Sequence, residues 1–184
     1  RVATFGDAHP LTLEGRDRLG DMLRQASRFD EAERELVLTL ERRESDPSTS
    51  SAHLANSLNN LGLLLLSRGE QARAEPLLRR ALMLREQLAA GEGIDAQSLQ
   101  STQVNLAMLL QRSGRSQEAE TPFREVLDAR RHALGDHPDT ARAAQSLAVL
   151  LLSRSRAVEA ESLLEEALAI QRRVLPDGHP DLTA

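Results

Sequence analysis

The chain has no cysteine, lysine, tryptophan or tyrosine, and only three phenylalanines among its 184 residues. Without cysteine there can be no disulfide framework, thiolate metal site or cysteine nucleophile. A core with so few aromatic residues must be built from Leu, Ala, Val, Ile and Met, and Leu and Ala favour helix over strand. The composition therefore predicts an all-α chain.

No apolar run approaches the length of a membrane-spanning helix. The longest, Leu61 to Leu66, is far shorter than the ~18 residues that such a helix needs. The stretch from Arg1 to Asp7 lacks the apolar core of a signal peptide. We therefore expect no membrane insertion and a cytoplasmic location. Because the chain does not begin with Met, we also expect it to be a piece of a longer protein.

The charge balance is mildly acidic. All 23 basic residues are arginine, and 28 acidic residues bring the formal net charge to −5. Nucleic-acid binding needs a basic stripe, so no nucleic-acid partner is expected. Acidic residues and arginines alternate along the chain, which is typical of solvated helix faces with local ion pairs.

Three marks recur together at steps of 42, 45 and 41 residues. The first is an Ala-Glu pair, whose alanines are Ala32, Ala74, Ala119 and Ala160. The second is a leucine thirteen residues earlier, followed by a small residue: Leu19, Leu61, Leu106 and Leu147. The third is a Gly or Ser between the first two: Ser27, Gly69, Gly114 and Ser155. Four units in register at three marks indicate an internal repeat.

Each unit is predicted to form two helices. Apolar residues fall at helical spacing on both sides of a turn, where a residue such as Gly114 ends the first helix in a left-handed conformation. His-Pro pairs at His9, His137 and His179 precede first helices, because proline suits the first helical position. The predicted helices are 10–26, 29–44, 50–68, 70–89, 95–113, 115–133, 138–154 and 156–174.

The pattern Leu-Gly-x-x-Leu … Gly … Ala-Glu resembles tetratricopeptide repeats (TPRs). The 42-residue period, the opening Asn59-Asn60-Leu61-Gly62 and the segment from Gly135 to Thr140 are similar to the long variety best known from kinesin light chains. The resemblance implies an all-α fold, an α-α superhelix or solenoid of about four TPR hairpins. Because aromatic residues are scarce, Leu65 and Leu110 are expected where that pattern often has tyrosine.

The resemblance also implies one array over residues 1–184. Its units would be about 5–46, 47–91, 92–135 and 136–176, with 177–184 beginning a further unit. Neighbouring hairpins must stack, because one hairpin cannot bury its apolar face alone.

In the family the first helix of each unit lines a concave face, where a peptide or helix binds. Helical spacing, counted from the four leucines taken as buried, puts Asp17, Asp21 and Arg24 there in the first unit. Later units present apolar and amide side chains, which suit a partner with apolar anchors. The alternative is that this strip packs against the neighbouring hairpin. The candidate peptide-binding residues are Asn56, Asn59, Asn60, Leu63, Leu66, Ser101, Val104, Asn105, Met108, Gln111, Arg142, Gln145 and Val149.

Asn60 and Asn105 stand, by resemblance, where family members hold a ligand backbone. An Asn amide offers a donor and an acceptor, which suits any peptide bond. A clamp for a C-terminal carboxylate is not expected, because such a site needs converging cations. The chain has no lysine, and Arg18 stands where that clamp has asparagine.

No constellation of residues predicts catalysis or a cofactor. The His-Pro histidines lie one or more whole repeats apart, so they are not expected to converge on a metal ion. The acidic pairs stand near the starts of second helices, where negative charge favours the helix dipole. Arginine pairs such as Arg42-Arg43, Arg130-Arg131 and Arg172-Arg173 end second helices, either as structural cations or as a phosphate-binding ridge.

The sequence therefore favours a protein–protein interaction module, an adaptor, scaffold or regulatory part of a larger protein. Its expected ligand is a protein or peptide. The alternative is a structural module that forms homo-oligomers by stacking through its terminal hairpins. That alternative follows from the last second helix, where Leu163, Leu164, Leu168 and Ile170 are expected to present an uncovered face.

Overall fold

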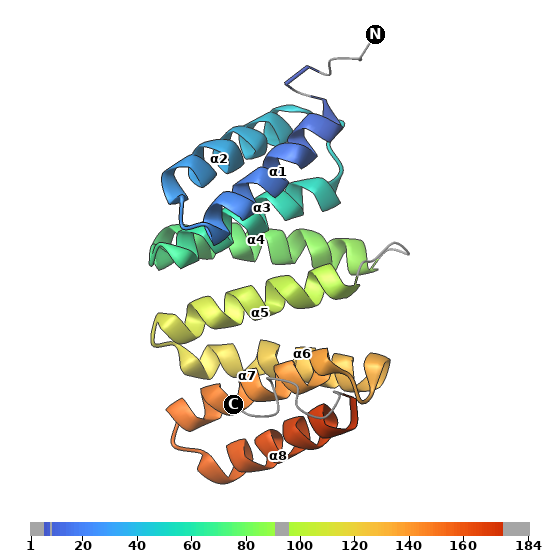
Figure 1. Cartoon of the computed structure of the whole chain (residues 1–184). Helices are drawn as coiled ribbons and strands as arrows, with labels where there is room; N and C mark the ends of the chain where they lie inside the picture. Colours follow the sequence, from blue (N-terminus) through green and yellow to red (C-terminus); the bar gives the residue numbers. More distant parts are fainter. Residues whose placement is uncertain (1–5, 8, 91–95, 175–184) are drawn as a thin grey trace. The chain divides into compact units, whose positions relative to one another are not determined.

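The structure, a computed structural model, describes residues 6–7, 9–90 and 96–174. In these ranges the chain forms eight α-helices and no strand (Figure 1). Every predicted helix is present, and each boundary differs from its prediction by at most one residue. The joint after the fourth helix and His179-Pro180 lie outside the described ranges. The helices are α1 Pro10–Gln25, α2 Phe29–Ser45, α3 Ser51–Ser67, α4 Gln71–Ala90, α5 Ala96–Arg112, α6 Ser116–Leu134, α7 Pro138–Ser153 and α8 Ala157–Val174.

The chain divides into two compact units. Unit 1 is Arg1–Leu109 and contains α1 to α4 and most of α5. Unit 2 is Leu110–Ala184 and contains the end of α5 and α6 to α8.

The predicted turns all use a left-handed residue. Ser27, Gly69, Gly114 and Ser155 have φ angles of 58°, 79°, 76° and 59°. The residue after each turn donates its backbone N–H to a carbonyl five residues back, as Arg28 does to Leu23 at 2.8 Å. This bond satisfies a carbonyl that the helix end leaves without a partner. The Gly/Ser mark therefore ends the first helix and allows the second to turn back.

Side chains cap the starts of α1, α3 and α7. His9 Nδ1 accepts the backbone N–H of Leu11 at 3.2 Å, and His137 Nδ1 accepts that of Asp139 at 3.1 Å. In α3 the hydroxyl of Ser50 accepts the N–H of His53 at 3.3 Å. The prediction that His-Pro begins a helix is confirmed at His9 and His137, where the histidine itself acts as the N-cap.

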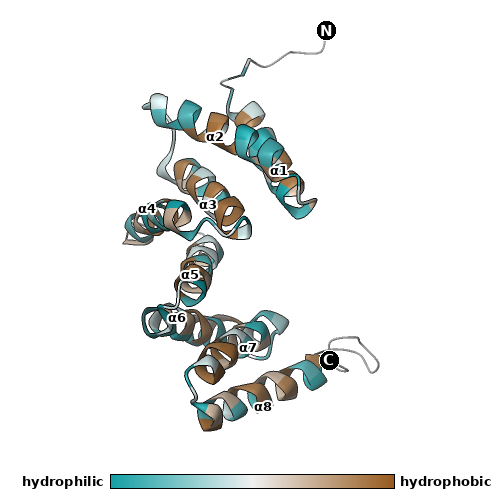
Figure 2. Ribbon diagram, turned by 90° about the vertical axis from the view of Figure 1, so that its left-hand side faces the viewer, coloured by the Kyte–Doolittle hydropathy of each residue, from teal (hydrophilic) through white to brown (hydrophobic). Residues whose placement is uncertain are grey.

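The two helices of a hairpin meet at small residues. The alanines of the Ala-Glu marks are fully buried. A Cβ atom added to Gly20 would lie 2.6 Å from the side chain of Leu36, and one added to Gly62 would lie 2.7 Å from that of Leu78. Small side chains therefore let α1 approach α2 and α3 approach α4. Figure 2 shows the result, with apolar residues covering much of α3.

Leu19 differs from the other leucines of its mark. Leu61, Leu106 and Leu147 are buried as predicted, but Leu19 is 44% exposed. Ser57 lies one turn before Leu61 on the same face of α3, and its hydroxyl donates a hydrogen bond to Asp17 of α1. This face of α3 is therefore turned towards α1. No helix of the described residues precedes α1 in the same way, so the prediction that Leu19 is buried was wrong.

The glutamate of the Ala-Glu mark joins consecutive repeats. Glu33 of α2 accepts hydrogen bonds from Arg68, after α3, at 2.6 Å and from Arg73 of α4 at 2.7 Å. In unit 2, Glu120 of α6 accepts from Arg154 and, at 2.7 Å, from Arg156, which both follow α7. The sequence predicted only a helix-dipole role for these carboxylates, because their arginine partners are 34 to 40 residues away.

Candidate peptide-binding site

A groove of about 600 Å³ lies along α1 and α3 of unit 1, which pack against each other (Figure 1). It includes two of the three charged positions that the sequence placed on the concave face of the first unit, Asp17 and Asp21. The side chains that line it are Glu14, Asp17, Arg18, Asp21, Met22, Arg43, His53, Asn56 and Asn60.

The groove rests on a buried polar cluster of Asp17, Arg43 and Ser57. One nitrogen of Arg43 (Nη1) donates to the Asp17 carboxylate at 2.5 Å, to the Ser57 hydroxyl at 2.6 Å and to the carbonyl of His53 at 2.9 Å. The Ser57 hydroxyl in turn donates to Asp17 at 3.3 Å. The cluster ties α1, α2 and α3 together, and it satisfies the charges that burial would otherwise penalise.

Burial dominates the titration of Asp17. Removal from water raises the pKa of its carboxyl above the ordinary value, while Arg43, Ser57 and Asn60 hydrogen-bond the charged form and oppose that rise. Asn60 therefore contacts both the groove and the buried carboxylate.

The same arrangement recurs one repeat later in unit 1. Arg85 of α4 donates to the carbonyl of Ser98, to the hydroxyl of Thr102 and, at 2.7 Å, to the Asn56 side-chain oxygen. Thr102 also contacts Asn59, which is 42 residues after Asp17 and occupies its place. We call this arrangement the arginine clasp, in which an arginine of a second helix binds the first helix of the following repeat.

A third arginine of the clasp lies in unit 2. Arg130 of α6 donates to the carbonyl of Asp139 at 3.0 Å, as Arg43 does to the carbonyl of His53 two repeats earlier. The last repeat lacks the clasp arginine, because Gln171 stands at the equivalent position, 41 residues after Arg130.

The clasp does not follow from the adjacent arginine pairs of the sequence. Arg85 has no adjacent arginine, and the pair Arg172-Arg173 falls after the clasp position. The steps of 42 and 45 residues from Arg43 to Arg85 and Arg130 were the signal that could have found it.

Two other arginines of the predicted pairs, Arg131 and Arg173, form ion pairs. Arg131 contacts Glu166 at 2.5 Å and Asp128 at 3.0 Å, and Arg173 contacts Asp136 at 2.7 Å. These ion pairs favour the structural alternative for the arginine pairs over the phosphate-binding ridge.

Two predicted site residues lie in the core. Leu66 is buried, and Asn59 is buried with its side-chain oxygen accepting a hydrogen bond from Asn105 at 2.9 Å. Neither residue lines an open groove, so that expectation was wrong. At Asn59 the reason is that α5, the first helix of the next repeat, packs against this side of α3. For Asn59, packing between repeats was the right alternative.

The remaining predicted residues are at least partly exposed. In unit 1, Asn56, Asn60, Leu63, Ser101, Val104, Asn105 and Met108 are accessible to solvent to differing degrees. In unit 2, Gln111 and Gln145 are half-buried, whereas Arg142 and Val149 are exposed. Arg142 forms an ion pair with Asp139 at 3.3 Å. The groove of unit 1 brings together only Asn56 and Asn60 from the predicted set.

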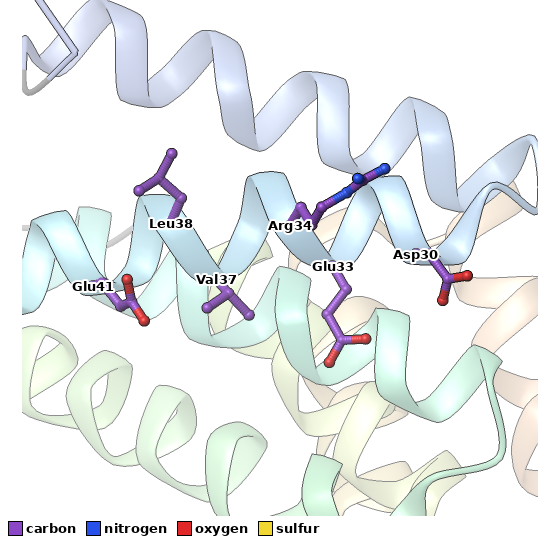
Figure 3. A pocket seen from close by; sticks show the side chains of 6 residues that line it. All are labelled: Asp30, Glu33, Arg34, Val37, Leu38 and Glu41. Carbon is purple, nitrogen blue, oxygen red and sulfur yellow. The ribbon is translucent and has the colours of Figure 1, made fainter.

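A second hollow, of about 680 Å³, lies on α2. The side chains that line it are Asp30, Glu33, Arg34, Val37, Leu38 and Glu41, all from this one helix (Figure 3). Glu33 is already held by Arg68 and Arg73. The α1–α3 groove is the better candidate, because three helices contribute polar side chains to it, with Arg43 coming from α2.

Two further kinds of feature are absent from the described ranges. No group of three or more His, Asp or Glu residues in them could hold a metal ion. None of the helices there is long and apolar enough to cross a bilayer.

Solved structures show where this fold occurs elsewhere. The nearly identical TPR-like repeats of a candidate kinesin light chain from Podosopora anserina align with a TM-score of 0.81 and 22% identity, over 95% of this chain and 82% of that one. BtubC (BKLC) from P. vanneervenii aligns at 0.79 and 23%, over 94% and 68%. YrrB, a TPR protein with an unusual peptide-binding site, aligns at 0.61 and 19%, over 92% and 72%. No curated protein matches the chain.

These structural similarities show that the chain has an all-α superhelical repeat fold. The profile of the tetratricopeptide repeat family matches residues 11–87 and 98–173, so the chain belongs to that family. The resemblance and fold class predicted from the sequence are thereby confirmed. Tetratricopeptide repeats are protein–protein interaction modules, and this chain belongs to that class. Proteins of the family are generally non-enzymatic scaffolds.

Proposed function

We propose that the chain binds a peptide segment of another protein in the α1–α3 groove of unit 1. The observation that carries the proposal is the groove itself, about 600 Å³ in volume and open along two first helices. Its walls combine amides with side chains of both charges, which suits recognition of an extended or helical peptide.

Asn56 and Asn60 are the residues proposed to hold the peptide backbone. They lie four residues apart on α3, so their side chains share one face of the helix. An amide can donate to a peptide carbonyl and accept from a peptide N–H. Glu14 and Asp21 on the facing α1 favour a basic side chain in the bound segment, since carboxylates bind guanidinium and ammonium groups well.

The buried cluster under the groove supports this role. Arg43 joins three helices through Asp17, Ser57 and the carbonyl of His53. A groove whose walls are held in place loses less conformational entropy when it binds a ligand.

The other exposed residues of the predicted strip extend the proposed site. In unit 1 the extension consists of Leu63, Ser101, Val104, Asn105 and Met108, which offer apolar anchors beside an amide. Gln111, Arg142, Gln145 and Val149 are proposed as contacts of unit 2 in their own right. An adaptor or regulatory role within a larger protein is part of the same proposal.

A peptide-library experiment tests the groove. Phage-displayed peptides are selected on the wild-type chain, and the dissociation constants of the selected peptides are measured by calorimetry. The double variant Asn60→Ala/Glu14→Arg is expected to raise those constants by about tenfold or more, because it removes an amide and reverses a carboxylate. Glu41→Arg on α2 is the matched control, and it should change them less than about twofold.

Circular dichroism must first show that all the chains are equally helical. Peptides that bind the double variant as tightly as wild type would remove the α1–α3 groove from consideration. If Glu41→Arg weakened binding as strongly as the groove variant, the effect would be one of overall charge.

A further inference from the structure

Four of the apolar side chains exposed on α1 and α8, the first and last described helices, stand at repeat positions that are otherwise mostly buried. Leu19 and Met22 of α1 are 44% and 66% exposed, and Leu164 and Leu168 of α8 are 39% and 36% exposed. Two residues occupy the same repeat position when steps of 42, 45 and 41 residues relate them. The exposure of these four side chains is exceptional, because the residues at the same repeat positions elsewhere are buried or half-buried.

The positions of the α1 pair are buried in every other repeat. Leu61, Leu106 and Leu147 share the position of Leu19, and all three are buried. Leu64, Leu109 and Leu150 share that of Met22, and all three are fully buried. Leu19 and Met22 thus form a face that the other first helices do not expose to water.

The positions of the α8 pair follow the same rule. Leu36, Leu78 and Phe123 share the position of Leu164 and are buried. Leu40 and Leu127 share that of Leu168 and are buried, while Leu82 is half-buried. In the earlier repeats the first helix of the next repeat packs beside these residues, as α3 does on α2 and α7 on α6.

The α1 face and the α8 face are therefore the two halves of one kind of interface. We propose that a second copy of this chain docks its α1 face on the α8 face of the first, in the register that joins α6 to α7. The contact is head to tail, so it leaves one free face of each kind and can repeat.

Charge complementarity supports a second copy as the occupant. Inside unit 2, Arg156 donates to Glu120 at 2.7 Å and to Glu159 at 2.5 Å. Arg28 shares the position of Arg156, and Glu161 shares that of Glu120. Arg28 already contacts Glu31 as Arg156 contacts Glu159, and both Arg28 and Glu161 are exposed. Across the junction, Arg28 of one copy therefore meets Glu161 of the other.

Two small residues of the α1 face, Thr12 and Gly15, also fit a close contact with a facing helix. Gly15 of α1 has no atom within 4 Å of where its Cβ would be, and it shares its position with the buried residues Ser57, Thr102 and Ala143. Thr12 shares the position of Thr140, whose hydroxyl donates to the carbonyl of Arg130 at 3.5 Å. The α1 face can thus approach a facing helix as closely as α7 approaches α6.

Two features make the junction weaker than those inside the chain. Gln171 stands at the position of the clasp arginines, so the buried guanidinium is missing. Glu165 and Glu31 would meet where Arg124 and Glu159 form an ion pair at 3.1 Å. The association is therefore expected to be reversible and to depend on concentration. The substitution Glu165→Arg should strengthen it, because an ion pair with Glu31 would replace two like charges.

The test mixes two variants, each blocked at one end. Leu19→Glu blocks the α1 face and Leu164→Glu blocks the α8 face. Both residues are exposed, so both variants are expected to fold, which circular dichroism checks. Sedimentation equilibrium measures the mass from roughly micromolar to millimolar concentration. Wild type should form dimers and longer species, each variant alone should stay monomeric, and the mixture should form a 1:1 dimer that grows no further.

Further variants distinguish this interface from nonspecific association. Glu161→Arg should raise the dissociation constant about tenfold, and Glu161→Arg combined with Arg28→Glu should restore it. The groove variant Asn60→Ala/Glu14→Arg should leave association unchanged, so failure of one proposal does not entail failure of the other. A monomeric wild type over the whole range would overturn the proposal. So would self-association of the blocked variants, or a mixture that stays monomeric.

Discussion

A serine occupies the left-handed position at two of the four hairpin turns. Ser27 and Ser155 hold φ angles of 58° and 59°, where Gly69 and Gly114 serve the other two turns. A side chain with a Cβ atom is strained in that region by roughly 1 kcal/mol, whereas glycine is not. The repeat pattern predicted these positions, because the turn geometry recurs with the sequence mark.

Ser155→Gly is expected to raise the free energy of unfolding by about 0.5–1 kcal/mol, since relief of strain outweighs the extra freedom of the unfolded chain. Urea denaturation followed by circular dichroism measures it. Ser146→Gly, in the middle of α7, is the matched control and should destabilise by about 0.5–1 kcal/mol. A loss of stability with Ser155→Gly would show that the left-handed serine is not strained.

Glycines within helices have opposite roles at two positions. A Cβ on Gly62 would lie 2.7 Å from the buried side chain of Leu78, but a Cβ on Gly15 would meet nothing within 4 Å. Gly62→Ala is therefore expected to lower the free energy of unfolding by about 1–2 kcal/mol through overpacking. Gly15→Ala should raise it by up to ~1 kcal/mol, because alanine is the better helix former.

Thermal and urea denaturation of these two variants test the effect of the close approach. Equal effects at both positions would mean that helix propensity alone decides them, and that the contact between Gly62 and Leu78 does not limit the hairpin.

At the scale of elements, the arginine clasp sets how consecutive hairpins join. Arg43 is buried and binds α1 and α3 from α2. Loss of one partner of a buried ion pair leaves the other charge uncompensated, which costs about 3–5 kcal/mol. Arg43→Met should lower the free energy of unfolding by about that amount. Asp17→Asn should cost less than half as much, because the neutral Asn59 occupies the same place in the clasp of Arg85.

The pH dependence of stability follows from the raised pKa of Asp17. The folded chain holds this proton to a higher pH than the unfolded chain does. The contribution of Asp17 to the free energy of unfolding therefore falls as pH rises from the ordinary aspartate pKa through the raised one. Asp17→Asn removes that contribution, so the difference between wild type and variant should decrease over this window.

Urea denaturation at a series of pH values measures that difference. A difference that grew with pH would mean that the ion pair with Arg43 outweighs burial and lowers the pKa of Asp17 instead.

At the scale of the whole molecule, the two proposals use surfaces that share Met22, which lines the α1–α3 groove and also belongs to the α1 face. Peptide binding uses the groove along α1 and α3, whereas self-association uses the α8 face and the apolar edge of α1 at Leu19 and Met22. One array over residues 1–184 remains a prediction, with the units at their predicted bounds.

The sequence by itself determined the helices, their turns and the repeat. These features follow from local rules: helical spacing of apolar residues, a left-handed residue at each turn, and His-Pro before a first helix. The steps of 42, 45 and 41 residues then carried the pattern from one unit to the next.

Only the tertiary structure decided which side chains are buried between repeats. Asn59 and Leu66 were expected in an open groove but are buried, and Leu19 was expected in the core but is exposed. Each outcome depends on whether a neighbouring repeat covers that face, and helical spacing along one helix cannot contain this information. For the same reason Arg43, Asp17 and Ser57 form a cluster that joins residues up to 40 positions apart, which local spacing did not reveal.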